Sequence, residues 1–125
     1  MNLTNNEFQF MTVLWNANAP LTSPEILRLS VDKSWRDASL HRILNNLLEK
    51  GAVAEHGFIK DGKSISRTFV PAISCEEYYK AVFAGHTSRD VPLILSALLS
   101  RSDFDAETIK KMEGIIRDRR AEAEK

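Results

Sequence analysis

The sequence predicts a mainly helical chain with one small β-hairpin, and three observations lead to this prediction. Between residues 4 and 50, apolar residues recur three or four positions apart in three segments, as on the buried face of a helix. An Asp-Gly pair at 61–62 separates two β-prone runs, which is a strong hairpin signal. From residue 72 onward, only helical patterns occur. We therefore predict one region at residues 1–71 and a second, helical region at residues 72–125.

Length and charge narrow the classes of protein that the sequence fits. Its 125 residues, 43% of them hydrophobic, suffice for a small packed domain with an appendage, and not for a large enzyme. No apolar run approaches the length that spans a bilayer, and residues 1–10 lack the basic segment of a secretory signal, so we expect a cytoplasmic protein. The 17 basic and 17 acidic side chains argue against indiscriminate nucleic-acid binding but permit a local basic face.

Redox, metal and catalytic chemistry have little support in the sequence. Cys75 is the only cysteine, so no internal disulfide is possible. His41, His56 and His86 lie on different predicted elements, without the spacing of a zinc site. Neither a Ser-His-Asp pattern nor a pair of carboxylates suggests a catalytic centre. We therefore expect no enzyme activity, no metal and no cofactor.

Two capping boxes predict the starts of the first two helices. In a capping box, a Ser or Thr side chain and a Glu side chain three residues later each accept a hydrogen bond from the other residue's backbone N–H. Thr4 with Glu7 and Thr22 with Glu25 have this spacing. We expect the first helix to end between residues 16 and 20. The second is expected to run to about residue 30 and to bury Ile26, Leu27 and Leu29.

The third predicted helix, from about Trp35 to Lys50, has the most regular apolar pattern in the chain. Five apolar residues at helical spacing are expected to form its buried face: Leu40, Ile43, Leu44, Leu47 and Leu48. The opposite face is expected to present Ala38, His41, Arg42, Asn45 and Glu49. Gly51 follows as a C-terminal cap.

Three helices followed by a charged hairpin is the element order of a winged helix-turn-helix domain. In that order the third helix is the recognition helix, which lies in the major groove of DNA. Its exposed face offers His41, Arg42 and Asn45, and Arg pairs well with guanine and Asn with adenine. The position of this helix favours DNA contact over an ordinary solvated face.

The hairpin of such a domain, its wing, carries further cations. Lys60, Lys63 and Arg67 lie on it and are expected to contact phosphates or the minor groove, unless the turn is merely solubilising. From residue 33 to residue 67, seven basic residues stand against four acidic ones. This part of the chain is therefore expected to present a modestly positive face.

The second region is expected to form a dimer interface. A third capping box, at Ser74 and Glu77, starts a helix that is expected to close at Gly85. Two more short helices follow, and Asp103 or Asp105 caps the last one. The apolar stripes of these three helices consist of Tyr78, Tyr79, Val82, Phe83, Val91, Ile94, Leu95, Leu98, Leu99, Ile109, Met112 and Ile116. A unit this small cannot cover all of them by itself. We therefore expect a homodimer, whose two-fold symmetry would match a palindromic DNA site.

Several stretches of the chain share their sequence with a known family. They are residues 3–15, 21–26, 35–51 and 69–78. The most specific are Glu7 with Val13-Leu14-Trp15, and the segment from Leu47 to Gly51. In these stretches the chain resembles the penicillinase repressor family, which includes methicillin-resistance and copper-responsive repressors.

The resemblance implies a homodimeric winged-helix repressor that binds a double-stranded DNA operator. It implies that the recognition-helix positions are Arg36, Ser39, His41, Arg42 and Asn45. It also implies a possible partner, because in the penicillinase branch a sensor protease cuts an Asn-Phe bond in the dimerisation region. The comparable stretch here, residues 98–104, contains no Asn-Phe, and the Cys-x-Cys ligands of the copper-responsive branch are missing.

Two functions of other classes remain open at this point. A winged helix can serve as a protein-interaction module, which the neutral net charge permits. The chain can also be a helical adaptor in which the hairpin is incidental. Loss of DNA affinity with rising salt would separate the repressor hypothesis from both.

Overall fold

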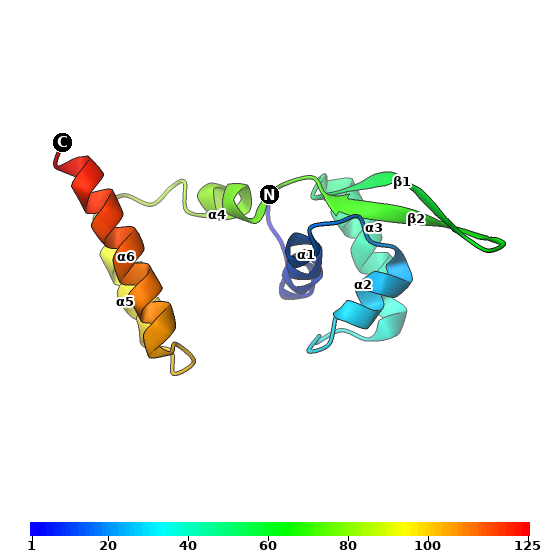
Figure 1. Cartoon of the computed structure of the whole chain (residues 1–125), viewed down its shortest axis with the longest axis horizontal. Coiled ribbons are helices and arrows are strands. Elements are labelled where there is room, and N and C mark those ends of the chain that lie inside the picture. Colours follow the sequence, from blue (N-terminus) through cyan, green and yellow to red (C-terminus); the bar gives the residue numbers. More distant parts are fainter. The chain divides into compact units, whose positions relative to one another are not determined.

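The computed structural model describes residues 1–60 and 62–125 in full and, at residue 61, only the backbone. The described chain forms two compact units, residues 1–84 and 85–125 (Figure 1). The elements of the first unit are α1 (Asn5–Ala17), α2 (Ser23–Leu29), the short 3-10 helix η1 (Asp37–Ser39), α3 (Leu40–Lys50), β1 (Val53–Asp61), β2 (Ser64–Pro71) and α4 (Cys75–Val82). The second unit contains α5 (Val91–Leu99) and α6 (Ala106–Ala123). The predicted fold class, mainly helical with one hairpin in a winged helix-turn-helix order, is confirmed.

The two compact units divide at residue 84, after α4. The reason is that α4 packs on α1. The ring of Tyr78 lies 6.0 Å from that of Phe8 and 5.9 Å from that of Trp15, between centroids. The indole N–H of Trp15 also donates to the backbone carbonyl of Ile73, at 2.9 Å. These contacts join α4 to the first unit.

The helix starts follow from the capping residues. Thr4, Thr22 and Ser74 each form the predicted capping box, at α1, α2 and α4. Asp105, and not Asp103, caps α6, because its carboxylate accepts from the backbone N–H of Thr108 at 2.7 Å. α1 ends at Ala17, where the following Asn18 has a φ of 54°.

Three local expectations are wrong. α3 begins at Leu40, because Arg36 is extended, residues 37–39 form η1, and Trp35 packs its ring 6.2 Å from that of Phe10 instead of joining the helix. Leu29 is 45% exposed at the end of the short helix α2. α4 ends at Val82, before Gly85, because Phe83 already leaves the helical conformation.

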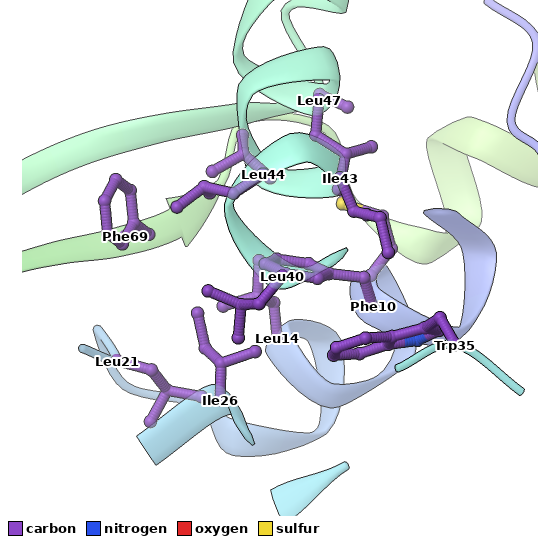
Figure 2. Packing of buried hydrophobic residues seen from close by; sticks show 13 residues of the cluster. Phe10, Leu14, Leu21, Ile26, Trp35, Leu40, Ile43, Leu44, Leu47 and Phe69 are labelled. Carbon is purple, nitrogen blue, oxygen red and sulfur yellow. The ribbon is translucent and has the colours of Figure 1, made fainter. Parts of the chain in front are cut away.

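The core of the first unit lies between α1, α2, α3 and the base of the hairpin. Phe10 of α1, Ile26 of α2, Leu44 and Leu47 of α3 and Phe69 of β2 are all less than 2% exposed and belong to one cluster (Figure 2). Burying a side chain of this size contributes about 1.5–3 kcal/mol. Because these residues take up one side of α3, the opposite side of that helix faces solvent.

The hairpin is fixed at its base and extends beyond the helices at its turn. Phe69 of β2 exchanges backbone hydrogen bonds of 2.8 and 3.1 Å with Leu21, just before α2. The register shifts between Glu55 and Phe58, which leaves one extra residue in β1. Gly57, with a φ of 98°, provides the backbone conformation that this bulge needs. In Figure 1 the turn of the hairpin projects away from α2 and α3.

The second unit is an open pair of helices. No residue of α5 or α6 is buried, and every residue of this unit is described. The most exposed large apolar side chains are Val91 (52%), Leu93 (74%), Ile115 (68%) and Ile116 (53%). A packed core of its own is therefore missing from residues 85–125.

Candidate nucleic-acid interface

The exposed side of α3 carries the polar residues that the sequence placed there. His41, Arg42, Asn45 and Glu49 are all exposed, and Leu40, Ile43, Leu44 and Leu47 are buried behind them. Of the two further positions implied by the family resemblance, Arg36 is exposed at the start of η1, whereas Ser39 is half-buried. The helix thus brings an Arg and an Asn to one accessible face, which is the side-chain chemistry that reads base edges in the major groove.

An ion pair fixes the C-terminal end of α3 to α1. The ammonium of Lys50 lies 2.5 Å from a carboxylate oxygen of Glu7, whose side chain is only 4% exposed. The same ammonium donates to the backbone carbonyl of Asn2 at 2.7 Å. Burial alone would raise the pKa of Glu7, but hydrogen bonds from Lys50 and the backbone of Thr4 lower it below its ordinary value of 4.5. Glu7 is therefore held ionised, and it orients α3.

The segment that precedes α3 in the chain is held in place by a second set of contacts. The backbone N–H of Ser34 donates to the side chain of Gln9 at 2.9 Å, which ties the loop after α2 to α1. The ammonium of Lys33 lies 2.7 Å from Asp37 and 5.4 Å from the centre of the Trp35 ring. Both ends of the segment from residue 34 to residue 50 are thus attached to α1.

Basic side chains along this surface differ in whether a carboxylate neutralises them. Lys33, Lys50 and Arg67 have acidic partners. Among the fully described side chains, no carboxylate lies within ion-pair distance of Arg36, Arg42, Lys60 or Lys63. Two of these four cations lie at or on the recognition helix and two on the hairpin. The uncompensated positive charge therefore belongs to the two elements that a winged helix presents to DNA.

Unlike Lys60 and Lys63, Arg67 is held by contacts with two neighbouring side chains. Its guanidinium pairs with the carboxylate of Glu55 on the neighbouring strand and lies 5.3 Å from the centre of the Phe69 ring. Half of its side chain is still accessible, at 49%. Lys60 and Lys63, nearer the turn, are exposed residues of the hairpin.

Two strongly exposed apolar residues of the hairpin are not among the candidate DNA-binding residues that the sequence predicts. Phe58 is 68% exposed and Ile65 is 67% exposed. Strand alternation alone does not reveal this, because both belong to β-prone runs of the kind that usually supply a core. The signal in the sequence is their closeness to the turn, where the strands have passed the end of the helices.

The residues expected to form the dimer interface have different environments. Tyr78 is 9% exposed and is covered within the first unit by α1. Exposed apolar side chains of the predicted set are Tyr79, Val82, Phe83, Val91, Leu98, Leu99 and Ile116. The half-buried ones are Ile94, Leu95, Ile109 and Met112. Apart from Tyr78, the apolar surface of the predicted interface is therefore accessible to a partner.

Comparison with known proteins decides among the classes of protein left open by the sequence. The family model described as "Penicillinase repressor" matches residues 3–118. The chain belongs to the penicillinase repressor family. Membership in this family of DNA-binding repressors makes the chain a transcriptional regulator, and the recognition made from the sequence is confirmed. No curated protein is significantly similar in sequence to this chain.

A solved structure supports the fold of this penicillinase repressor family member. The chain is similar to a mutant of MepR from a multidrug-resistant S. aureus clinical isolate, with a TM-score of 0.50 and 14% identity over 98% of this chain and 80% of that one. It also matches a MarR family transcriptional regulator from Silicibacter pomeroyi, with a TM-score of 0.47 and 17% identity over 91% of this chain and 68% of that one. At these identities the likeness concerns the fold alone.

Among the described residues, no group of three or more His, Cys, Asp or Glu side chains has the arrangement of a metal site. Within the same part of the chain, none of the helices combines the length and the hydropathy that a membrane span requires.

Proposed function

We propose that this protein is a sequence-specific repressor that binds a palindromic DNA operator as a homodimer. The observation that carries the proposal is the exposed face of α3, where Asn45 lies near Arg42 and Arg42 has no carboxylate partner among the fully described side chains. The ion pair between Lys50 and Glu7 attaches the end of this helix to α1. In this arrangement α3 enters the major groove, where Arg42 donates to guanine and Asn45 contacts adenine. Arg36, Ser39 and His41 flank this pair.

The hairpin supplies the sequence-independent part of the binding. Lys60 and Lys63 lack carboxylate partners among the described side chains and approach phosphates beside the minor groove. Arg67 contributes less, because Glu55 already neutralises its charge. The proposal thus assigns base contacts to α3 and backbone contacts to the wing.

The homodimer is proposed from the second unit and the end of α4. Exposed apolar side chains such as Leu98 and Ile116 are not covered within the second unit, since no residue of α5 or α6 is buried. Val82, at the end of α4, is also 44% exposed. A second copy of the chain covers such surface by symmetry and sets two recognition helices on two half-sites. Residues 72–125 therefore serve dimerisation, and residues 1–71 serve DNA binding.

Release from DNA is proposed to act on the dimer. Each half-site is bound at the effective concentration set by the other, so separating the subunits lowers occupancy steeply. The exposed joint between α5 and α6, where Arg101 pairs with Asp103 at 2.6 Å, is the segment a sensor protease would reach. A chain truncated after Leu99 is expected to dimerise poorly and bind its operator weakly. Full dimerisation and affinity of that chain would exclude cleavage here as the switch.

The experiment that tests the proposed function is selection of binding sites from a random double-stranded DNA pool with the full-length protein. We expect an enriched inverted repeat whose half-sites are about 10–10.5 base pairs, or a multiple of that, apart. Affinity for the selected duplex should fall steeply with salt concentration, because phosphate contacts release counterions. Absence of any enriched sequence together with salt-independent binding would contradict the proposal and favour a protein-interaction module.

A further inference from the structure

One face of the outer half of the hairpin exposes two large apolar side chains that no part of the proposed function uses. Phe58 and Ile65 are 68% and 67% exposed, although Phe69 on the same β2 strand as Ile65 is only 1% exposed. Single exposed apolar residues are common on protein surfaces and need no explanation. Two neighbouring ones on a projecting hairpin form a patch that a binding partner can contact.

The strand register places Phe58 and Ile65 on one face of the hairpin. Directly opposed residues of an antiparallel pair point to the same side, and Phe58 pairs with Arg67 while Lys60 pairs with Ile65. Residues two apart on one strand also share a face, which joins Ile65 to Arg67 and Phe58 to Lys60. We call this set, Phe58, Lys60, Ile65 and Arg67, the wing patch. Ile59 pairs with Ser66 and points to the other side.

The wing patch lies on the face of the hairpin that, nearer the base, packs against the core. Phe69, two residues from Arg67 on β2, points into the core with Leu44 of α3. The same side of the hairpin, nearer the turn, therefore projects past the helices on the side from which α3 packs against the sheet. A duplex bound along α3 would meet this face.

The charges around the patch favour DNA over an apolar partner. Lys60 lies within the patch and Lys63 lies at the turn, and among the described side chains neither has a carboxylate partner. An apolar centre bordered by cations matches the minor groove, whose walls are deoxyribose carbons and whose rims are phosphates. The patch also adjoins the proposed phosphate-contacting residues of the wing.

We propose that Phe58 and Ile65 contact the deoxyribose walls and base edges of the minor groove beside each half-site. This inference rests on the proposed function and adds an apolar, uncharged component to it. Side chains of this kind pack between base steps or against sugars in minor-groove binding, and they favour sequences whose groove opens easily. The wing then contributes to site preference in addition to anchoring the backbone.

The test uses a duplex selected by the full-length wild-type protein and compares three variants. Phe58→Ala/Ile65→Ala removes both apolar side chains. Ile59→Ala is the matched control, since Ile59 is 46% exposed on the opposite face of the same strand. Lys63→Ala removes one phosphate contact. All the substituted side chains are exposed, so urea unfolding is expected to show wild-type stability for each variant.

We expect the double variant to bind the duplex at least about tenfold more weakly than wild type. The slope of log affinity against log salt concentration should stay unchanged, because no phosphate contact is lost, whereas Lys63→Ala should make that slope less steep by about one. Dimethyl sulfate methylates adenine N3 in the minor groove. Wild type and Ile59→Ala should protect this atom beside the half-sites, and the double variant should not.

Two results would overturn the inference in distinguishable ways. If the double variant binds as Ile59→Ala does and protects the same adenines, the wing patch does not contact the minor groove, and the proposed function stands. If the wild-type protein selects no duplex at all, the proposed function fails and this inference fails with it.

Discussion

Glu7 is the residue through which the recognition helix is attached to the rest of the domain. Its carboxylate is almost completely buried, caps α1 with Thr4 and accepts from Lys50 at the end of α3. A buried charge of this kind is stable only while its partners remain in place, because an uncompensated buried charge is costly. One side chain thus links the start of α1, the end of α3 and the orientation of the face that carries Arg42.

Replacing Glu7 by Gln should lower the free energy of unfolding by about 1–3 kcal/mol at pH 7, because it removes a charge-assisted hydrogen bond. The pKa of Glu7 is lowered in the folded protein. Its contribution is therefore present above its ordinary pKa of 4.5 and is lost as the pH falls through the folded pKa. Urea unfolding at pH 7, 5 and 4 should show the difference between Glu7→Gln and wild type shrinking at the lowest pH.

The control for this prediction is Glu76→Gln on α4. Glu76 pairs with Lys80 at 3.1 Å, but its side chain is 77% exposed, so the pair should contribute little. A difference between Glu7→Gln and wild type that stays constant from pH 7 to pH 4 would mean that the buried ion pair is not its source.

At the scale of single elements, the three helix starts with capping boxes were predictable, whereas the start of α3 was not. Thr4, Thr22 and Ser74 start helices because their side chains satisfy free backbone N–H groups, which is a purely local effect. Trp35 has an apolar side chain that fits a helix, yet it packs on Phe10 from a bend that precedes η1. Tertiary packing decides this choice, so the pattern alone placed the start of α3 too early.

In the hairpin too, the feature that depends on local sequence was predictable, and the features that depend on tertiary packing were not. The Asp-Gly turn fixed its position, whereas the bulge near Gly57 and the exposed Phe58 depend on how far the strands extend past the helices. For the candidate site, the face of α3 followed from helical periodicity. The pairing of Arg67 with Glu55 across the hairpin did not, because register cannot be read from composition.

Burial separates two leucines that the sequence treats alike. Leu44→Ala should lower the free energy of unfolding by about 2–5 kcal/mol, because Leu44 is 1% exposed and its removal leaves a cavity in the core. Leu29→Ala should cost less than about 1 kcal/mol, since Leu29 is 45% exposed. Urea unfolding of both variants gives the comparison. Equal losses would mean that the core does not lie where α1, α2 and α3 meet.

At the scale of the whole molecule, the two units differ in whether they hold a core. Residues 1–84 bury a continuous cluster, whereas residues 85–125 have no buried residue. A unit that cannot hide its apolar side chains is stabilised by association with a second chain. In the proposed function, the first unit therefore binds DNA, and the second unit joins two such units by forming the dimer.

Sedimentation at micromolar concentration should give a mass of about twice 14.1 kDa. Leu98→Glu should shift the protein toward monomer, because it places a charge in the predicted apolar stripe of α5. Leu93→Glu is the matched control, since Leu93 lies about half a turn of helix away from that stripe and is 74% exposed. A wild-type monomer at this concentration would remove the main reason for assigning residues 72–125 to dimerisation.

The central claim is that Arg42 on α3 contacts a base of the operator. The measurement is the affinity of wild type, Arg42→Ala and Lys63→Ala for the selected duplex and for duplexes with each half-site position substituted. Arg42→Ala should lose about 1–3 kcal/mol on the selected duplex and become indifferent to one position in each half-site. Lys63→Ala should weaken binding to all the duplexes similarly. If Arg42→Ala keeps the affinity and the sequence preference of wild type, α3 does not present its exposed face to the bases, and the account is wrong.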